Sequence, residues 1–433
     1  MVIVFALGYA AIAFEHNLKI DKAAAALATG VICWAIYALG SHGGHGAHSP
    51  EASLLHHLGE ISNILFFLLG AMTIVETVDA HEGFAVITDR INTNKARVLL
   101  WIICWLTFFF SAILDNLTTS IVMISLLKKL IDDKQLRWLF AGMVVIAANS
   151  GGAFSPIGDV TTTMLWIGGQ VSTVSIILNV FSPALVSLLV PLVIMTYLIK
   201  GTVTAPEDNN NGEEHAVTRR EQSIVFTAGV LGLLFVPVFK TVTHLPPFMG
   251  MMLSLGVMWL VVDIMHRNKP ANVRHDIGVL GVLRKIDTPS VLFFLGILLA
   301  VASLQESGQL TQVADALKVA FGIEETTGIY IIGSIIGVLS AIVDNVPLVA
   351  ASMGMYPVAE AGFFAQDGLF WQFLAYTAGT GGSILIIGSA AGVAVMGLER
   401  IPFGWYLKRI SLLALVGYLA GVGAYMLQVM LVG

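Results

Sequence analysis

The sequence has 433 residues, of which 57% are hydrophobic and only 12% are charged, and its mean hydropathy is +0.85. This composition excludes a soluble globular protein and indicates a chain that crosses a membrane many times. The formal net charge of −6 gives no reason to expect a nucleic-acid partner, and Cys33 and Cys104 lie in apolar runs, where they are predicted to be core residues.

The first 78 residues contain three apolar runs, over about 2–14, 23–39 and 61–78, each predicted to be a membrane span. The histidine-rich stretch 41–58 separates the second from the third, and we expect a solvated loop there, although its composition also suits metal binding or pH sensing. Glu76 lies near the end of the third run. It is either a proton-handling acid or a side chain that reaches the membrane interface.

A re-entrant hairpin is predicted near 98–130. Its first arm is apolar and ends in the phrase Ser111-Ala-Ile-Leu-Asp-Asn116, and a shorter helical stretch leads on to Lys129. Each arm is marginally short for a full membrane crossing, for which about 20 apolar residues are needed. An intramembrane carboxylate at such a tip is costly and therefore indicates a functional site.

A discontinuous helix is predicted near 138–168, because Gly and Pro interrupt it around Asn149-Ser-Gly-Gly152 and Ser155-Pro-Ile-Gly-Asp159. Freed backbone groups are tolerated at membrane depth only where they line a protein cavity. A span near 174–199 and a hydrophilic stretch at 201–222 follow, and the latter is typical of a linker.

The second half repeats this order. The phrase Ser340-Ala-Ile-Val-Asp-Asn345 occurs 229 positions after the first copy. Residues 1–200 and 223–433 are therefore predicted to be two repeats joined by a cytoplasmic linker. In the second repeat, spans near 224–238, 249–265 and 291–304 precede the hairpin near 327–357, the broken helix near 369–397 and the last span near 404–432.

Charge sets the expected orientation. If each hairpin returns to the side that it entered from and every other segment crosses once, all of the 22 Lys and Arg residues except Lys240 and Lys318 fall on the cytoplasmic side. The two repeats then run in opposite directions. The predicted fold is an all-α polytopic membrane protein with an inverted-topology repeat, two re-entrant hairpins and two discontinuous helices.

Inverted repeats with interrupted helices place substrate and ion sites near the midplane, which predicts a secondary transporter and not an enzyme. No Walker A pattern is present, so an ion gradient is the expected energy source. The predicted midplane carries Asp115, Asp159 and Asp344 beside amides and hydroxyls and has no Lys or Arg, which favours a small monovalent cation. A carboxylate removed from water can hold a proton when empty and release it to a bound cation, so no separate cofactor is needed.

The two S-A-I-[LV]-D-N phrases, the stretch Asn149-Ser-Gly-Gly152 with Gly158-Asp-Val-Thr-Thr-Thr163, and Phe14-Glu-His16 resemble NhaD-type sodium/proton antiporters of the ion transporter superfamily. The resemblance implies a bacterial inner-membrane antiporter of Na⁺ or Li⁺ against H⁺, working as a homodimer among membrane lipids by an elevator-type motion. It implies that the cation and the proton bind at Asp115, Asn116, Thr118, Asn149, Ser150, Asp159, Thr161, Thr162, Ser340, Asp344, Asn345, Thr380 and Ser383.

Alternatives stay open at this point. An arsenite or dicarboxylate transporter could share the fold, although related dicarboxylate symporters have Ser-Asn-Thr at both tips and this sequence does not. Paired membrane aspartates also occur in intramembrane proteases. The hydroxyls of Thr161, Thr162 and Thr163 could simply bond backbone carbonyls in a broken helix.

Overall fold

The computed structural model describes residues 1–13, 15–40, 49–88, 91, 93–204, 217–270, 277–322, 325–342 and 344–432. In these ranges the chain forms helices and connecting loops, and eight helices are long and apolar enough to cross a membrane. The prediction of an all-helical, multi-pass membrane protein is confirmed. His42, His45 and His48 of the histidine-rich stretch lie outside the described residues. His56 and His57 belong to the helix Pro50–Ala80, so the prediction of a loop over 41–58 is wrong for its second part.

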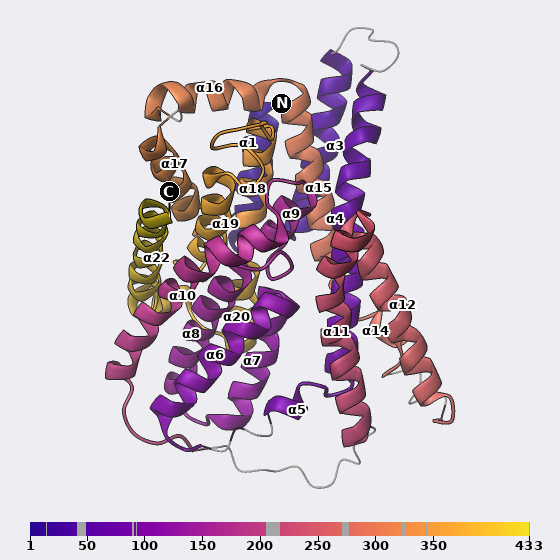
Figure 1. Cartoon of the computed structure of the whole chain (residues 1–433), viewed down its shortest axis with the longest axis vertical. Helices are drawn as coiled ribbons and strands as arrows, with labels where there is room; N and C mark the ends of the chain where they lie inside the picture. Colours follow the sequence, from indigo (N-terminus) through magenta and orange to yellow (C-terminus); the bar gives the residue numbers. More distant parts are fainter. Residues whose placement is uncertain are drawn as a thin grey trace.

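Two groups of helices lie side by side (Figure 1). The first group, drawn mainly on the right and toward the top, combines the early helices of both halves of the chain. Its members are α1 (Val2–Ala13), α3 (Lys22–Gly40), α4 (Pro50–Ala80), α11 (Arg219–Thr243), α12 (Pro247–His266) and α15 (Thr288–Glu306). Within it α3 packs along α15, and α12 packs against both α11 and α4.

The second group combines the later helices of both halves. Its members are α6 (Ala96–Leu114), α7 (Asn116–Leu130), α8 (Lys134–Ala153), α9 (Val160–Ile167), α10 (Thr173–Leu198), α17 (Thr326–Leu339), α18 (Asn345–Met355), α19 (Leu369–Gly381), α20 (Ala390–Glu399) and α22 (Ser411–Val432). Short helices complete the connections, namely α2 (Glu15–Leu18), α5 (Ala85–Thr88), α14 (Val279–Val282), α16 (Gln309–Phe321) and α21 (Phe403–Arg409).

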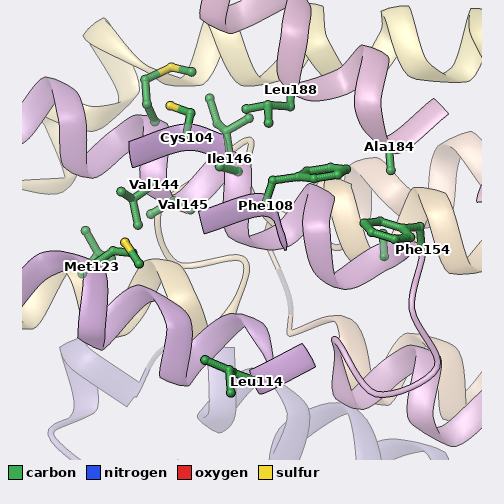
Figure 2. Packing of buried hydrophobic residues seen from close by; sticks show 14 of the residues in the cluster. Cys104, Phe108, Leu114, Met123, Val144, Val145, Ile146, Phe154, Ala184 and Leu188 are labelled. Atoms are coloured by element: carbon green, nitrogen blue, oxygen red, sulfur yellow. The ribbon is translucent and has the colours of Figure 1, made fainter. Parts of the chain in front are cut away.

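Close side-chain packing holds the second group together (Figure 2). The rings of Phe108 in α6 and Phe154 after α8 stack with centroids 5.0 Å apart. Met123 of α7 and Leu188 of α10 belong to the same buried cluster. Because lipid is as apolar as these side chains, close van der Waals contact contributes more to this packing than removal from water does.

Helices are interrupted at four places in this group. At Asp115 the break is a single residue, with φ of 79° and ψ of 160°. A non-glycine residue in such a conformation costs of order 1–3 kcal/mol and tends to occur at functional sites. Residues 154–159 separate α8 from α9, residues 382–389 separate α19 from α20, and α17 ends at Leu339, well before α18 begins at Asn345.

Equivalent contacts recur in the two halves. The hydroxyl of Ser111 donates to the carbonyl of Ala148 at 2.6 Å, and the hydroxyl of Ser340 donates to the carbonyl of Ala378 at 2.9 Å. In the first half the bond joins α6 to α8. In the second half it joins Ser340, just after α17, to α19. These recurring contacts are what a duplicated sequence with a common local fold would produce.

Two equivalent glycines allow the helices to approach this closely. A Cβ built on Gly151 would lie 2.0 Å from the carbonyl oxygen of Phe108, and one built on Gly381 would lie 2.0 Å from the carbonyl oxygen of Gly337. Both obstacles are backbone atoms within helices. No side-chain rotation can therefore make room for a methyl group at either position.

We expect Gly151→Ala to lower the free energy of unfolding by about 1–3 kcal/mol or more, the usual cost of overpacking a close contact. The control is Gly423→Ala in α22, where nothing lies within 4 Å of the added Cβ. Thermal unfolding of the purified variants in detergent would measure the difference. Equal melting temperatures for Gly151→Ala and Gly423→Ala would contradict the close approach of α6 and α8.

Candidate ion-binding site

A cavity of about 70 Å³ lies where the two helix groups meet. The first group contributes apolar residues such as Phe67 and Met251 together with the ammonium of Lys22, and the second group contributes the interrupted helices. A water needs about 10–15 Å³ on this measure, so the cavity has room for several waters or a partly hydrated cation. Of the predicted site residues, those that line it are Asp115, Asn116, Thr118, Asp159, Asp344 and Asn345.

Asp159 accepts hydrogen bonds from side chains that lie at two of the other helix breaks. Its side chain caps α9, because Oδ1 accepts hydrogen bonds from the backbone N–H and the hydroxyl of Thr161, both at 2.9 Å. The amide Nδ2 of Asn116 donates to Oδ2 at 2.7 Å, and the amide Nδ2 of Asn345 donates to the same oxygen at 3.3 Å. The carboxylate, which is only 2% exposed, is thus held by the asparagines of both repeated phrases.

Asn149 extends this network into the second half of the chain. Its Oδ1 accepts from Asn116 Nδ2 at 3.0 Å, and its Nδ2 donates to the hydroxyls of Ser383 and Ser389, each at 2.9 Å. Ser389 was not among the predicted site residues. The signal was present, since Ser389 follows a glycine 230 positions after the Gly158-Asp159 pair.

The two tip aspartates are held differently. Asp115 accepts from the backbone N–H and the hydroxyl of Thr118, both at 2.8 Å, so each carboxylate oxygen has a donor in its own loop. Asp344 accepts from the backbone N–H of Val346 at 3.2 Å. Its other oxygen lies 3.5 Å from the ammonium Nζ of Lys22.

The contact with Lys22 corrects the sequence-based expectation that no Lys or Arg lies near the breaks. Lys22 is the first residue of α3, and the apolar run that follows it made it look like a loop lysine on the cytoplasmic side. The fold instead brings it to a carboxylate 322 positions away. Nothing in the local sequence around Lys22 indicates this partner.

Four other predicted site residues make hydrogen bonds to backbone carbonyls or to a neighbouring helix. Ser150 shares a hydrogen bond of 2.8 Å with Ser187 of α10, and the hydroxyl of Thr162 donates to the carbonyl of Asp159 at 2.9 Å. The hydroxyl of Thr380 donates to the carbonyl of Tyr376 at 2.6 Å. Ser150 and Ser340, whose bond is described above, thus link neighbouring helices, whereas Thr162 and Thr380 bond to carbonyl groups three and four residues earlier in the chain.

A second cavity continues from the first. The two share lining residues that include Lys22, Thr118 and Ser290, and the second is also lined by Glu76 and Asp79 near the end of α4. Glu76 therefore lies in a vestibule and not at the three-aspartate site. A separate cavity beside His57 and Glu60 shares no lining residue with the site cavity in the part of the chain that the structure describes.

The charges at the site favour a cation. The cavity is lined by three carboxylates and one ammonium, which leaves a net charge of −2 when all are ionised. The remaining polar atoms around it are amide and hydroxyl groups, which with carboxylates are the oxygen ligands that hard cations prefer. A multi-pass bundle with interrupted helices around a small charged cavity defines the class as a membrane transporter.

A family model described as "Citrate transporter" matches residues 9–381, and the chain belongs to this family. It is 48% identical to "Sodium/proton antiporter 1" of Arabidopsis thaliana over 98% of this chain and 72% of the relative, and 44% identical to "Sodium/proton antiporter 2" over 98% of both. It is 30% identical to "Na(+)/H(+) antiporter NhaD" of Vibrio cholerae over 98% of this chain and 90% of the relative.

These relatives confirm the resemblance to NhaD-type transporters inferred from the repeated phrases. Because the family and its members are transporters, the chain is not an enzyme, and the protease alternative is set aside. Its place in a membrane is likewise supported by the candidate spans. A bacterial inner membrane stays a prediction, since two of these relatives are plant proteins.

Proposed function

We propose that this protein exchanges Na⁺, or Li⁺, for H⁺ across its membrane at the cavity around Asp159. The observation that carries the proposal is the convergence of both tip asparagines on one buried carboxylate. A buried carboxylate without a compensating positive charge is strongly disfavoured, so a proton or a cation must accompany it. Mutually exclusive binding of the two would couple their movements without a separate proton carrier.

In the proposed cycle, the empty site holds protons on its carboxylates and exchanges them for a cation on one side of the membrane. Carboxylate oxygens of Asp159, Asp115 and Asp344 would bind the cation, and the amides of Asn116 and Asn345 would orient Asp159. The backbone and hydroxyl donors of Thr161 and Thr118 would keep the acids in place during exchange. The cation itself is the transported substrate, and no cofactor is required.

The same proposal includes the movement. The second helix group carries the interrupted helices, and the first group provides the opposing wall of the cavity. We propose that the two hairpins and two discontinuous helices form inverted repeats and that the second group slides against the first in an elevator-type motion within a homodimer. In this conformation the site would open through the vestibule beside Glu76, toward the predicted cytoplasmic side.

Citrate is a second candidate because the matching family model carries that description. A tricarboxylate would have to enter a cavity whose own net charge is −2, and only one lysine lines it in the described part of the chain. The repulsion between like charges in a partly desolvated site argues against this substrate. The charge balance therefore favours cation exchange within this family.

Purified protein in liposomes with a lumenal pH dye would test the proposal. We expect external Na⁺ or Li⁺ to cause a proton flux in the opposite direction, and we expect citrate to cause none. A choline salt at the same ionic strength serves as the control for non-specific leakage. Citrate uptake without any response to Na⁺ or Li⁺ would overturn the assignment in favour of the anion.

A further inference from the structure

The two halves differ just after the repeated phrases, at a position that changes the hydrogen bonding of the aspartate. Thr118 follows Asp115 by three residues, and the equivalent position after Asp344 is Pro347. Thr118 supplies a backbone N–H to one oxygen of Asp115 and a hydroxyl to the other. Proline has neither donor. Among the described residues of its own loop, Asp344 therefore accepts from the N–H of Val346 alone, and that bond engages Oδ1.

The second carboxylate oxygen of Asp344, Oδ2, is in contact with Lys22. Nζ lies 3.5 Å from Oδ2, and the two side chains are 23% and 14% exposed. The same Nζ lies 4.7 Å from the centroid of the Phe293 ring in α15, a distance suited to a cation–π contact. With both contacts, the ammonium is held among the residues that line the site cavity.

Helix stability does not account for a lysine at this position. Lys22 is the first residue of α3, where the positive end of the helix dipole disfavours a cation. Asp21 caps the turn by accepting from the N–H of Ala23 at 2.7 Å, so the cap does not need Lys22. The favourable partners of the ammonium are instead Asp344 and Phe293, both outside α3.

The ion pair also connects the two helix groups. Lys22 belongs to α3 of the first group, and Asp344 precedes α18 of the second. Lys22 lines both the site cavity and the vestibule, so it lies where the two cavities adjoin. The other charged groups that line these two cavities are Asp115, Asp159, Glu76, Asp79, Lys285 and Asp287.

We propose that Lys22 is a tethered competitor for the cation site: its ammonium pairs with Asp344 when that carboxylate carries neither the cation nor a proton, and the transported cation must displace it. This inference rests on the proposed Na⁺/H⁺ exchange. Displacement weakens cation binding enough to permit release, and the contact between the groups is broken when either the cation or a proton occupies Asp344. Lys22 thus sets both the affinity for the cation and the condition under which the second group moves.

The test is the Na⁺-dependent rise in melting temperature of purified protein in detergent, with choline chloride holding ionic strength constant. We expect Lys22→Met, which keeps an apolar chain against Phe293, to bind Na⁺ on the order of tenfold more tightly, because close charge pairs commonly couple by this much or more. Lys22→Arg keeps the charge and should retain the weaker affinity. Maximal exchange by Lys22→Met in liposomes should fall, since release becomes slower.

A double-mutant cycle separates competition from a structural role. If Lys22 acts through Asp344, Lys22→Met should leave Na⁺ affinity unchanged in an Asp344→Asn background. Unchanged affinity in Lys22→Met alone, or an equal gain in both backgrounds, would overturn the proposal. If Lys22→Met does not fold, Lys22→Gln provides the same comparison.

The reference for the proposed function is the unmodified protein. If Na⁺ does not stabilise it, the exchange proposal and this inference fail together. If Na⁺ stabilises it but Lys22→Met responds with the same affinity, only the role of Lys22 fails.

Discussion

Replacing Asp159 with Asn should reduce Na⁺/H⁺ exchange by more than about 100-fold, because the bound cation would lose its buried carboxylate partner, and loss of one partner of a buried charge pair typically costs about 3–5 kcal/mol. Asparagine has nearly the same shape but cannot carry the negative charge or release a proton. Its Nδ2 would also point donors at the amide groups of Asn116 and Asn345, which now donate to Oδ2. The measurement is the initial proton flux in liposomes after addition of Na⁺.

The matched control for this prediction is Asp263→Asn in α12. Asp263 is exposed and does not line the site cavity, so its replacement removes one carboxylate without touching the network. Both variants should be purified as folded protein with similar elution profiles. Exchange in Asp159→Asn at the level of Asp263→Asn would remove Asp159 from the transport site.

The second large effect concerns pH. If Na⁺ and H⁺ compete for the same carboxylates, the apparent Na⁺ constant should rise about tenfold for each unit by which pH falls below the pKa of the site, for one competing proton. The direction follows from the competition, since acid populates the protonated site that excludes Na⁺. Turnover at saturating Na⁺ should change much less than affinity.

Exchange measured against Na⁺ concentration at several pH values checks this dependence. An apparent Na⁺ constant that does not change with pH, together with a maximal rate that falls as pH falls, would indicate a separate pH gate. Glu76 in the vestibule and the histidine-rich stretch 41–58 would then be better candidates than the three aspartates. Asp159, Asp115 and Asp344 would in that case bind the cation without handling the proton.

Local sequence signals predicted much of the architecture because the helix breaks have local causes. Gly and Pro at Gly151-Gly152 and Pro156, together with the polar residues that cap the next helix, identify the interruption between α8 and α9 directly. The repeated phrase likewise located the break at Asp115. The short helix α16 was not predicted, although Gly308 and Gly322, both in the left-handed conformation, mark the two ends of Gln309–Phe321.

Part of the hydrogen-bond network around Asp159 could be predicted, because the repeated phrase supplied the comparison between the two halves. Asn116 and Asn345 occupy matching positions, and the structure brings both to Asp159. Lys22 was not predictable, since its contact with Asp344 depends on how α3 packs along α15 beside the second repeat. A pairing between residues 322 positions apart comes from tertiary packing and leaves no trace in either local pattern.

Residues at matching positions of the two halves need not have the same chemistry. Asp159 and Ser389 hold matching positions and both cap the following helix, yet only one carries a charge. Thr118 and Pro347 differ in the same way at the tips. The predicted duplication would therefore supply two similar halves, while differences at single positions decide which half carries a charge at a given place.

Proton release on Na⁺ binding tests the central claim most directly. Purified protein in weakly buffered detergent solution, with a soluble pH indicator, would be mixed with NaCl and, separately, with choline chloride. The shared-carboxylate account predicts a release of protons on addition of Na⁺ that grows from alkaline pH toward the pKa of the site and is absent in Asp159→Asn. Na⁺ binding that stabilises the protein without releasing protons at any pH would contradict it.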